Sequence, residues 1–421
     1  MTSIERLEEL IILNLGDLKQ GEQLWKIGIS DISGRGVFAT RNIKCGEVIF
    51  EEAPLLIGPA SRNEDTLSNC CICYSSVAVL CDDGCGLPVC GLCSDRHKSE
   101  CVLFKSWEPT EPQTLNKCRL RFLTAARSIT LSSNQKEVLY AMQANVDKPF
   151  QKEFENAMAC FRKLLDKNNI DHLYRTMAVL NTNSFVVNSE SPCPLRALYP
   201  LGGMVNNECV PNSTYTFEKK NYNMILKAAK DIIKGEEITN SYTKLLWSNL
   251  MRRLYLKITK HFICKCKRCL DSTEGGSLLS ALYCKADDCS GLVVPEASTS
   301  LHPDWKCLKC ETNYPHVAMS KKLNILLKSM DSKLNTSSLA EAIDFIVDKC
   351  PLLVPESNQI IVEAKYNIVS RINSSDEGIH LEILDVSRRF CEELLTILDK
   401  LGVGASEIRT YLENQKKRER Q

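Results

Sequence analysis

The chain has 421 residues, and its 53 Lys and Arg against 52 Asp and Glu give a net charge of +1. This length predicts two or three domains, and the balanced charge excludes a general polyanion-binding surface, though not a local basic patch. No apolar run approaches the roughly 18 residues of a membrane span, and the acidic N-terminal stretch MTSIERLEELIILNLG lacks the features of a signal peptide.

The first hundred residues combine strand signals with a cysteine-rich segment. Residues 24–58 predict strands, because apolar and β-branched runs are broken by the turn SGRG. Residues 70–101 are dense in cysteine and poor in large apolar side chains. A segment of this kind cannot fold on a hydrophobic core alone, so we expect it to need metal.

The middle of the chain reads as helical and then as strands again. Between residues 115 and 190, apolar side chains recur at three- or four-residue steps, which predicts helices. One predicted helix face carries Phe154, Met158, Phe161 and Leu165, and a second carries Leu173, Met177 and Leu180. Residues 196–242 predict two strands around the polar turn KKNYN and a third at EEITNSY.

The last part of the chain is cysteine-rich at residues 259–312 and then helical. Ser338 and Glu341 form the sequence pattern of a capping box ahead of an apolar run. The final 110 residues are therefore expected to be wholly helical. The basic tail QKKRERQ is interpreted as a solvated end, with a nuclear localisation patch as the alternative.

The 22 cysteines are the most unusual feature of the composition. Without a secretory signal we expect a reducing compartment, where close-spaced cysteines bind metal rather than form disulfides. Fifteen of them belong to three groups. The other seven are expected to be small buried hydrophobic residues, and they are Cys45, Cys71, Cys118, Cys160, Cys193, Cys350 and Cys391.

The first cysteine group supplies eight ligands within 32 residues, enough to close two tetrahedral zinc sites. With every position filled by protein, these zinc ions would be structural. The alternative is a chance cluster of free thiols, which four pairs at ligand spacing disfavour. The predicted ligands are Cys70, Cys73, Cys81, Cys85, Cys90, Cys93, His97 and Cys101.

The second and third groups predict further zinc sites, for three to four ions in all. Cys264, Cys266 and Cys269 lack a fourth ligand, and Cys209 in MVNNECVPNS is the best candidate. A shared zinc would fasten the NNECVPN loop to the later cluster. The third group has the form of a zinc ribbon, with a reduced thiol cluster as the alternative, and comprises Cys284, Cys289, Cys307 and Cys310.

The order of motifs resembles a known family. GRGVFATRNIKCGEVI, a MYND-type zinc module, NNECVPN, GEEITNSY and CKCKRC follow one another as in the SET-and-MYND (SMYD) methyltransferases, and the sequence after Tyr242 is most similar to their arthropod SmydA branch. The resemblance implies an α+β fold. It divides the chain into an N-terminal SET portion (1–66), a MYND module (67–104), a helical SET insert (105–195), a C-terminal SET portion (196–258), a post-SET zinc site (259–275), a zinc ribbon (276–315) and a C-terminal helical domain (316–421).

The resemblance also implies an activity, the transfer of a methyl group from S-adenosylmethionine (SAM) to a lysine of a histone or non-histone protein. Tyr242 matches the tyrosine at the methyl-transfer centre and also contacts SAM in the family. The other residues that match cofactor contacts are Gly34, Arg35, Gly36, Asn183, Asn206, Asn207 and Phe262.

The chemistry requires a neutral acceptor amine. An apolar, aromatic channel lowers the pKa of a lysine by desolvation and can hold its cationic form over an aromatic face. A tyrosine hydroxyl and backbone carbonyls can orient the nitrogen, and most of the acceleration comes from alignment of donor and acceptor.

The NNECVPN loop departs from the family pattern, because Asn207 replaces a histidine and Glu208 a serine. The alternative function is therefore a weak or inactive SET-MYND adaptor, whose MYND module binds proline-rich peptides of transcriptional partners. We expect the protein in the cytoplasm and nucleus. The charge balance argues against direct nucleic-acid binding, and we expect no membrane association.

Overall fold

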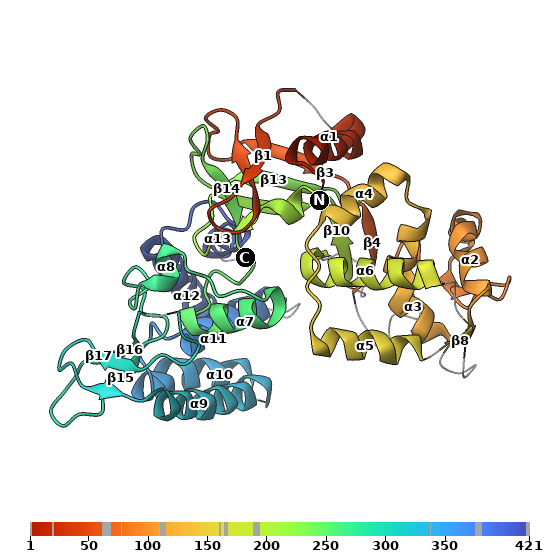
Figure 1. Ribbon diagram of the computed structural model, residues 1–421. Coiled ribbons are helices and arrows are strands. Elements are labelled where there is room, and N and C mark those ends of the chain that lie inside the picture. Colours follow the sequence, from red (N-terminus) through yellow and green to blue (C-terminus); the bar gives the residue numbers. More distant parts are fainter. Residues whose placement is uncertain are drawn as a thin grey trace.

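The computed structural model describes residues 2–18, 21–60, 69–76, 78–109, 115–159, 161–163, 167–187, 194–297, 299–336, 338–374 and 381–417. Figure 1 shows short strands at the top of the molecule, with one group of helices and the C-terminal helices below them on opposite sides. Within the described ranges, no helix is both long enough and apolar enough to cross a membrane.

Three small sheets form the strand-rich part, and each joins segments far apart in the sequence. The first has the order β1 (Trp25–Ile29), β2 (Arg35–Ala39), β14 (Glu237–Asn240), β11 (Asn206–Asn207), with β11 parallel to β14. The second sheet has the order β4 (Leu56–Pro59), β10 (Leu195–Leu198), β9 (Phe185–Val187). The third has the order β12 (Ser213–Phe217), β13 (Met224–Ala228), β3 (Val48–Glu52). The strands predicted within residues 24–58 and 196–242 are thus confirmed, including the KKNYN turn between β12 and β13.

Helix α1 (Ile4–Leu15) closes the core of these sheets. Leu7, Leu10, Ile11 and Leu15 lie on one face and are buried in the same cluster as Trp25 and Val37. This spacing of apolar residues is typical of an amphipathic helix. The short turns η1 (Gly16–Leu18) and η6 (Gly202–Met204) border the same region.

The cysteine-rich segment 69–105 and the helices after it share a second core. The segment contains β5 (Val79–Leu80), β6 (Pro88–Val89), η3 (Gly91–His97) and α2 (Lys98–Lys105). The elements that follow are β7 (Glu108–Pro109), α3 (Leu115–Ala126), η5 (Arg127–Thr130), α4 (Ser133–Ala141), α5 (Lys148–Met158), β8 (Phe161–Lys163) and α6 (Lys167–Asn183).

One predicted helix face is wrong. Helix α5 ends at Met158, and Phe161 lies in strand β8, which pairs with β7. The reason is aromatic packing, since the Phe161 ring meets Trp107 and Phe122 at centroid distances of 5.3 and 5.9 Å. Leu165 lies outside the described residues. The second predicted face is confirmed, because Leu173, Met177 and Leu180 are buried in α6.

The C-terminal part has a third core of its own. Helices α7 (Asn249–Lys260) and α8 (Lys267–Leu270) lead to a four-stranded sheet of β15 (Leu282–Tyr283), β16 (Leu292–Pro295), β17 (Trp305–Cys307) and β18 (Asn313–Tyr314). The helical elements after it are α9 (His316–Thr336), α10 (Leu339–Asp344), η7 (Phe345–Lys349), η8 (Cys350–Leu352), α11 (Gln359–Asn373), α12 (Leu381–Lys400) and α13 (Glu407–Lys416). Helix α10 begins at the predicted capping box of Ser338 and Glu341. Residues 418–421 of the basic tail lie outside the described residues.

A backbone contact fastens the C-terminal helices to the strand-rich part. The amide of Ala405 donates a hydrogen bond to the carbonyl of Ala229 at 2.8 Å. A Cβ on Gly404 would lie 2.1 Å from that carbonyl oxygen, so the approach requires a glycine. The loop before α13 therefore lies directly against the end of β13.

Candidate functional site

The sixteen predicted metal ligands come together as four groups of four. Within each group the ligand atoms lie within 4.8 Å of one another. The first eight ligands alternate between two groups along the chain. Their spacing in the sequence did not show which ligand belongs to which group. The groups are Cys70, Cys73, Cys90 and Cys93; Cys81, Cys85, His97 and Cys101; Cys209, Cys264, Cys266 and Cys269; and Cys284, Cys289, Cys307 and Cys310.

The distances between sulfur atoms fit tetrahedral zinc. Two thiolates on one zinc, each with a bond of about 2.3 Å, lie about 3.8 Å apart. The Cys73–Cys90 distance is 3.7 Å, the Cys209–Cys264 distance 3.9 Å and the Cys289–Cys307 distance 3.8 Å. These separations are far longer than a disulfide bond of about 2.05 Å. Each group can therefore hold one tetrahedral ion.

His97 is oriented as a metal ligand by its second nitrogen. Its Nδ1 lies 2.6 Å from the carbonyl oxygen of Ser94, and its Nε2 faces the Cys81 sulfur at 3.1 Å. A hydrogen bond from Nδ1–H to a carbonyl fixes the tautomer whose Nε2 lone pair is free to bind metal.

The third group joins the loop after β11 to helix α8, as predicted for Cys209. Its sulfur lies 3.5 Å from that of Cys269, 60 positions later. Buried arginines surround the group: Arg252 Nη2 lies 3.4 Å from the Cys269 sulfur, and Arg252 Nη1 pairs with Glu274 at 2.7 Å. Positive charge stabilises thiolates. Sequence reasoning missed Arg252, although it shares a face of α7 with buried Leu256 four residues later.

The remaining cysteines agree only in part with the expected burial. Cys71, Cys350 and Cys391 are buried. Cys45 is exposed, and the prediction for it is wrong, because it lies in the turn before Gly46 where its amide donates to Asp231. Cys160 and Cys193 lie outside the described residues, as does the side chain of Cys118.

The predicted glycine loop and Asn206 lie together. Asn206 Nδ2 donates to the Arg35 carbonyl at 2.9 Å and to Glu237 Oε1 at 2.8 Å, and Ser30 donates to the other oxygen of Glu237 at 2.8 Å. A Cβ on Gly36 would lie 2.2 Å from Glu237 Oε1, so any other residue at this position would force the carboxylate to move. Gly34 has φ +58°, a conformation that also favours glycine.

Asn207 connects Tyr242 with the third cysteine group. Its Oδ1 accepts the Tyr242 amide at 2.9 Å, and its Nδ2 faces the Cys264 sulfur at 3.6 Å. The Tyr242 hydroxyl donates to the Val205 carbonyl at 2.8 Å. Burial raises the pKa of Tyr242 well above its usual value, so the phenol stays protonated near neutral pH.

Phe262 and Asn183 complete the predicted set. Phe262 and Tyr242 both pack against the cluster of Cys209, Leu256, Cys264 and Cys269. Asn183, at the end of α6, donates to the Gln143 carbonyl at 2.6 Å. The Arg35 guanidinium donates to the Ala141 carbonyl, and burial lowers the pKa of Arg35. The segment 141–145, which no sequence motif marked, thus joins the glycine loop to α6.

The carboxylate of Glu208 is engaged within its own loop. Its Oε1 accepts a hydrogen bond from the backbone amide of Cys209 at 3.0 Å. The backbone amide of Glu208 donates to the Asn240 carbonyl at 2.9 Å. The replacement of the family serine by glutamate is therefore accommodated as a local turn contact.

Lys260 is an unpredicted member of the site. Its Nζ donates to the Thr182 carbonyl at 2.6 Å and lies 5.5 Å from the centre of the Tyr242 ring. Burial lowers its pKa to about 8. Sequence reasoning gave this lysine no role.

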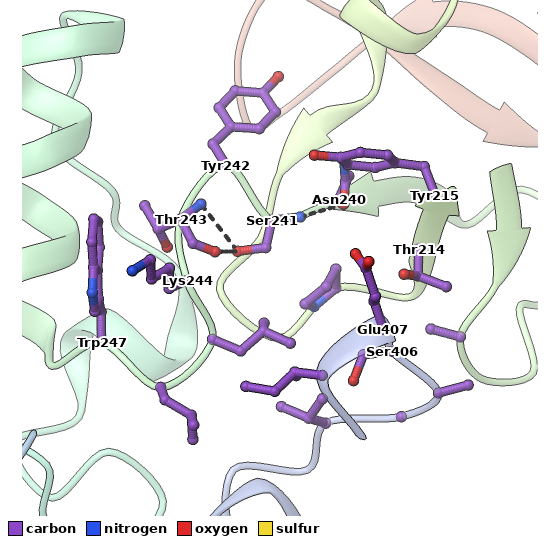
Figure 2. A pocket seen from close by; sticks show the side chains of 18 of the residues that line it. Thr214, Tyr215, Asn240, Ser241, Tyr242, Thr243, Lys244, Trp247, Ser406 and Glu407 are labelled. Atoms are coloured by element: carbon purple, nitrogen blue, oxygen red, sulfur yellow. Dashed lines mark hydrogen bonds between the residues drawn. The ribbon is translucent and has the colours of Figure 1, made fainter. Parts of the chain in front are cut away.

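A cavity of about 490 Å³ opens beside Tyr242, between the strands and the C-terminal helices. Figure 2 shows Tyr242 at one edge and Ser406 and Glu407, from the start of α13, on the opposite side. Trp247 is fixed by a hydrogen bond of 2.6 Å from its Nε1 to Glu363. The volume suits a ligand side chain and its neighbours, and further aromatic lining comes from Tyr215, Tyr255 and Tyr366.

Comparison with known proteins agrees with this architecture. A family model described as SET domain matches residues 34–243. The SET domain-containing protein SmydA-8, isoform B, of Drosophila melanogaster is 42% identical over 415 residues, covering 96% of this chain and 92% of that protein. The histone-lysine N-methyltransferase ASHR1 of Arabidopsis thaliana is 26% identical, covering 78% of this chain and 72% of its own.

More distant similarities are also found. The human histone-lysine N-methyltransferase SMYD3 is 24% identical over 270 residues, covering 59% of this chain and 61% of that protein. Among solved structures, the SET domain of LSMT bound to lysine and AdoHcy covers 98% of this chain and 92% of its own, with 10% identity and a TM-score of 0.34, which is too low to carry an assignment. The relationship to SmydA-8 over nearly the whole length of both proteins shows that the chain belongs to the SMYD family, in its SmydA branch.

Proposed function

We propose that this protein is a SAM-dependent protein-lysine N-methyltransferase. The observation that carries the proposal is the convergence of Tyr242, Asn206, Asn207 and Phe262 around one fold junction, with a peptide-sized cavity at its edge. Relatives named as histone-lysine or N-lysine methyltransferases support it. The acceptor is a lysine of a histone or non-histone protein.

The residues present suit a SAM molecule, which supplies an electrophilic methyl group when bound. The backbone of Gly34–Gly36 permits close approach of a ligand. Asn206 and Asn207 border the same region, and their side-chain amides are held in place by Arg35, Glu237 and Tyr242. Phe262 offers an aromatic face beside Tyr242.

The chain's own residues prepare the acceptor. The cavity admits the substrate segment, and its aromatic walls at Tyr215, Tyr255 and Tyr366 exclude water. Desolvation lowers the pKa of an entering lysine, which yields the neutral amine. The proton leaves to water, and orientation at Tyr242 accounts for most of the acceleration.

We also propose that all four cysteine groups hold structural zinc. Their sulfur spacings support one ion each. Metal analysis of the intact chain then gives four zinc ions per molecule, and two would mean that the later groups stay empty. The first two groups form the MYND module of the proposed architecture, for which proline-rich peptides are the proposed partners, and the proposed location is the cytoplasm and nucleus.

The second candidate function is an adaptor that keeps the SET scaffold without efficient catalysis. The observation that favours it is that other residues of the chain already bond the polar groups of the site. Asn206 is hydrogen-bonded to Arg35 and Glu237, and Lys260 lies over the Tyr242 ring. In this case the zinc modules and the cavity would serve partner binding.

Calorimetry with SAM distinguishes the two functions. The enzyme predicts micromolar binding that Asn206→Ala weakens at least tenfold, while Asn221→Ala, at an exposed turn asparagine, leaves it unchanged. A peptide array with labelled SAM then identifies acceptor lysines. Absence of binding at millimolar SAM by the folded, zinc-loaded protein would leave the adaptor.

A further inference from the structure

The side chain of Lys260 points into the protein instead of into solvent. Lys260 is the last residue of α7, and Lys257, one turn earlier on the same helix, is exposed. Among the residues that the structure describes, no carboxylate lies within ion-pair distance of Lys260. A partly buried ammonium without a carboxylate is costly, so its position calls for a reason.

The amino group makes two kinds of contact. It donates to the Thr182 carbonyl at 2.6 Å, and it lies 5.5 Å from the centre of the Tyr242 ring. The first contact caps the C-terminal end of α6, where cations are favourable. Capping does not require the second contact. A carbonyl acceptor together with an aromatic face is the environment that an acceptor lysine needs at a methyl-transfer centre.

We propose that Lys260 occupies the amine position at Tyr242 and thereby determines which acceptors enter. An external lysine takes this position only when the Lys260 amino group withdraws, because two ammonium groups cannot share one aromatic face and one carbonyl. Lys260 acts as a specificity-determining residue, an internal competitor for the substrate amine. Its meaning for catalysis rests on the proposed methyltransferase function, whereas its effect on amine binding does not.

The elements around Lys260 make withdrawal feasible. It ends α7, and His261 after it has φ +62°, so the chain changes direction there. The backbone carbonyl of Lys260 accepts a long hydrogen bond, from Asn145 Nδ2 at 3.4 Å. A rotation of its flexible side chain is enough to free the Tyr242 ring.

The test uses n-butylamine as a probe of the amine position in the full, zinc-loaded chain. Tyrosine rings are labelled with 13C, and Tyr242→Phe assigns the Tyr242 signal. Lys260→Met removes the amine and keeps the aliphatic stem. Lys260→Arg keeps the cation and the donor to Thr182, and Lys257→Met is the matched control on the exposed face of α7. Circular dichroism and thermal unfolding verify the fold, and Lys260→Gln replaces Lys260→Met if the latter fails to fold.

We expect n-butylamine to shift the Tyr242 signal. The dissociation constant obtained from this shift should be at least tenfold lower in Lys260→Met than in the wild type. Lys260→Arg and Lys257→Met should respond like the wild type. Equal affinity in wild type and Lys260→Met, or weaker affinity in Lys260→Met, would overturn the inference.

Methyl incorporation from labelled SAM on a lysine peptide array separates this inference from the proposed function. At least tenfold higher incorporation by Lys260→Met supports both. Tighter n-butylamine binding without SAM binding rejects the methyltransferase and keeps Lys260 as an internal occupant. Lower incorporation by Lys260→Met than by a methylating wild type keeps the enzyme and rejects the inference.

Discussion

The carboxamide of Asn207 bonds on one side to the backbone of Tyr242 and faces the sulfur of Cys264 on the other, at 2.9 and 3.6 Å. One buried side chain therefore connects the tyrosine of the site with a cysteine group that can hold metal. We expect Asn207→Ala to cost about 1–3 kcal/mol of stability, because the Tyr242 amide loses its partner. Denaturant unfolding measures this cost. Asn324→Ala, at an exposed position of α9, is the control, and an equal effect of both substitutions would contradict the role given to Asn207.

Replacement of Cys209 should remove one metal ion. Cys209→Ser leaves Cys264, Cys266 and Cys269 with three sulfur ligands, one short of a closed tetrahedral site. We expect zinc content to fall from four to three per chain and the thermal midpoint to drop. Cys45→Ser, at an exposed cysteine outside all four groups, should keep four. Four zinc ions in Cys209→Ser would show that Cys209 is not a ligand.

A side chain at Gly36 should destabilise the protein while Glu237 is present. Gly36→Ala places a Cβ 2.2 Å from Glu237 Oε1, so a shift of the carboxylate breaks its bonds to Ser30 and Asn206. We expect a loss of about 1–3 kcal/mol of stability. In a Glu237→Ala background the same substitution should cost less, and a double-mutant cycle measures the difference. Gly91→Ala, where the Cβ meets open space, serves as the control. Full additivity would mean that the two residues do not interact.

Glu52 should make the protein less stable as the pH rises. It is fully buried and accepts the amides of Leu201 and Gly202 at 2.8 Å, and burial raises its pKa to about 7. Between about pH 4.5 and 7 the unfolded state has lost a proton that the folded state keeps, so stability falls by about 3 kcal/mol relative to Glu52→Gln. Urea unfolding at pH 4.5 and 7.5 compares the two proteins. A constant difference across this window would refute the raised pKa.

Lys260 should have the opposite pH dependence. Burial lowers its pKa to about 8 from 10.5 in the folded protein. Between these values the unfolded chain holds the extra proton, so the wild type gains about 3 kcal/mol relative to Lys260→Met as the pH rises from 8 to 10.5. Tyr242, whose ring the amine faces, is common to both proteins. Parallel stability curves would place the amine in solvent.

The four cysteine groups were predictable because ligand spacing follows from coordination chemistry. Cys264, Cys266 and Cys269 lack one ligand, which directed attention to Cys209. The interleaved assignment of Cys81 and Cys90 to different groups depends on the path of the chain between them, and spacing does not encode that path.

Sequence reasoning missed residues whose role depends on contacts between distant segments. Lys260 and Arg252 resemble surface residues of an amphipathic helix until the neighbours of α7 are known. The helical period across Phe161 failed because the ring packs against Trp107, a contact between distant segments that overrides local periodicity. The strands succeeded since β-branched runs and turns mark them locally.

The hydrogen bond from Ala405 to Ala229 sets the wall of the cavity that faces Tyr242. That wall belongs to residues 403–408, on a different part of the chain from the glycine loop and the asparagines. Under the proposed function, changes in the length or composition of this one loop would alter which peptides the cavity admits, while the residues around Tyr242 stay the same. A SET scaffold of this kind then separates target choice, set by the C-terminal loop, from the chemistry proposed at the strands.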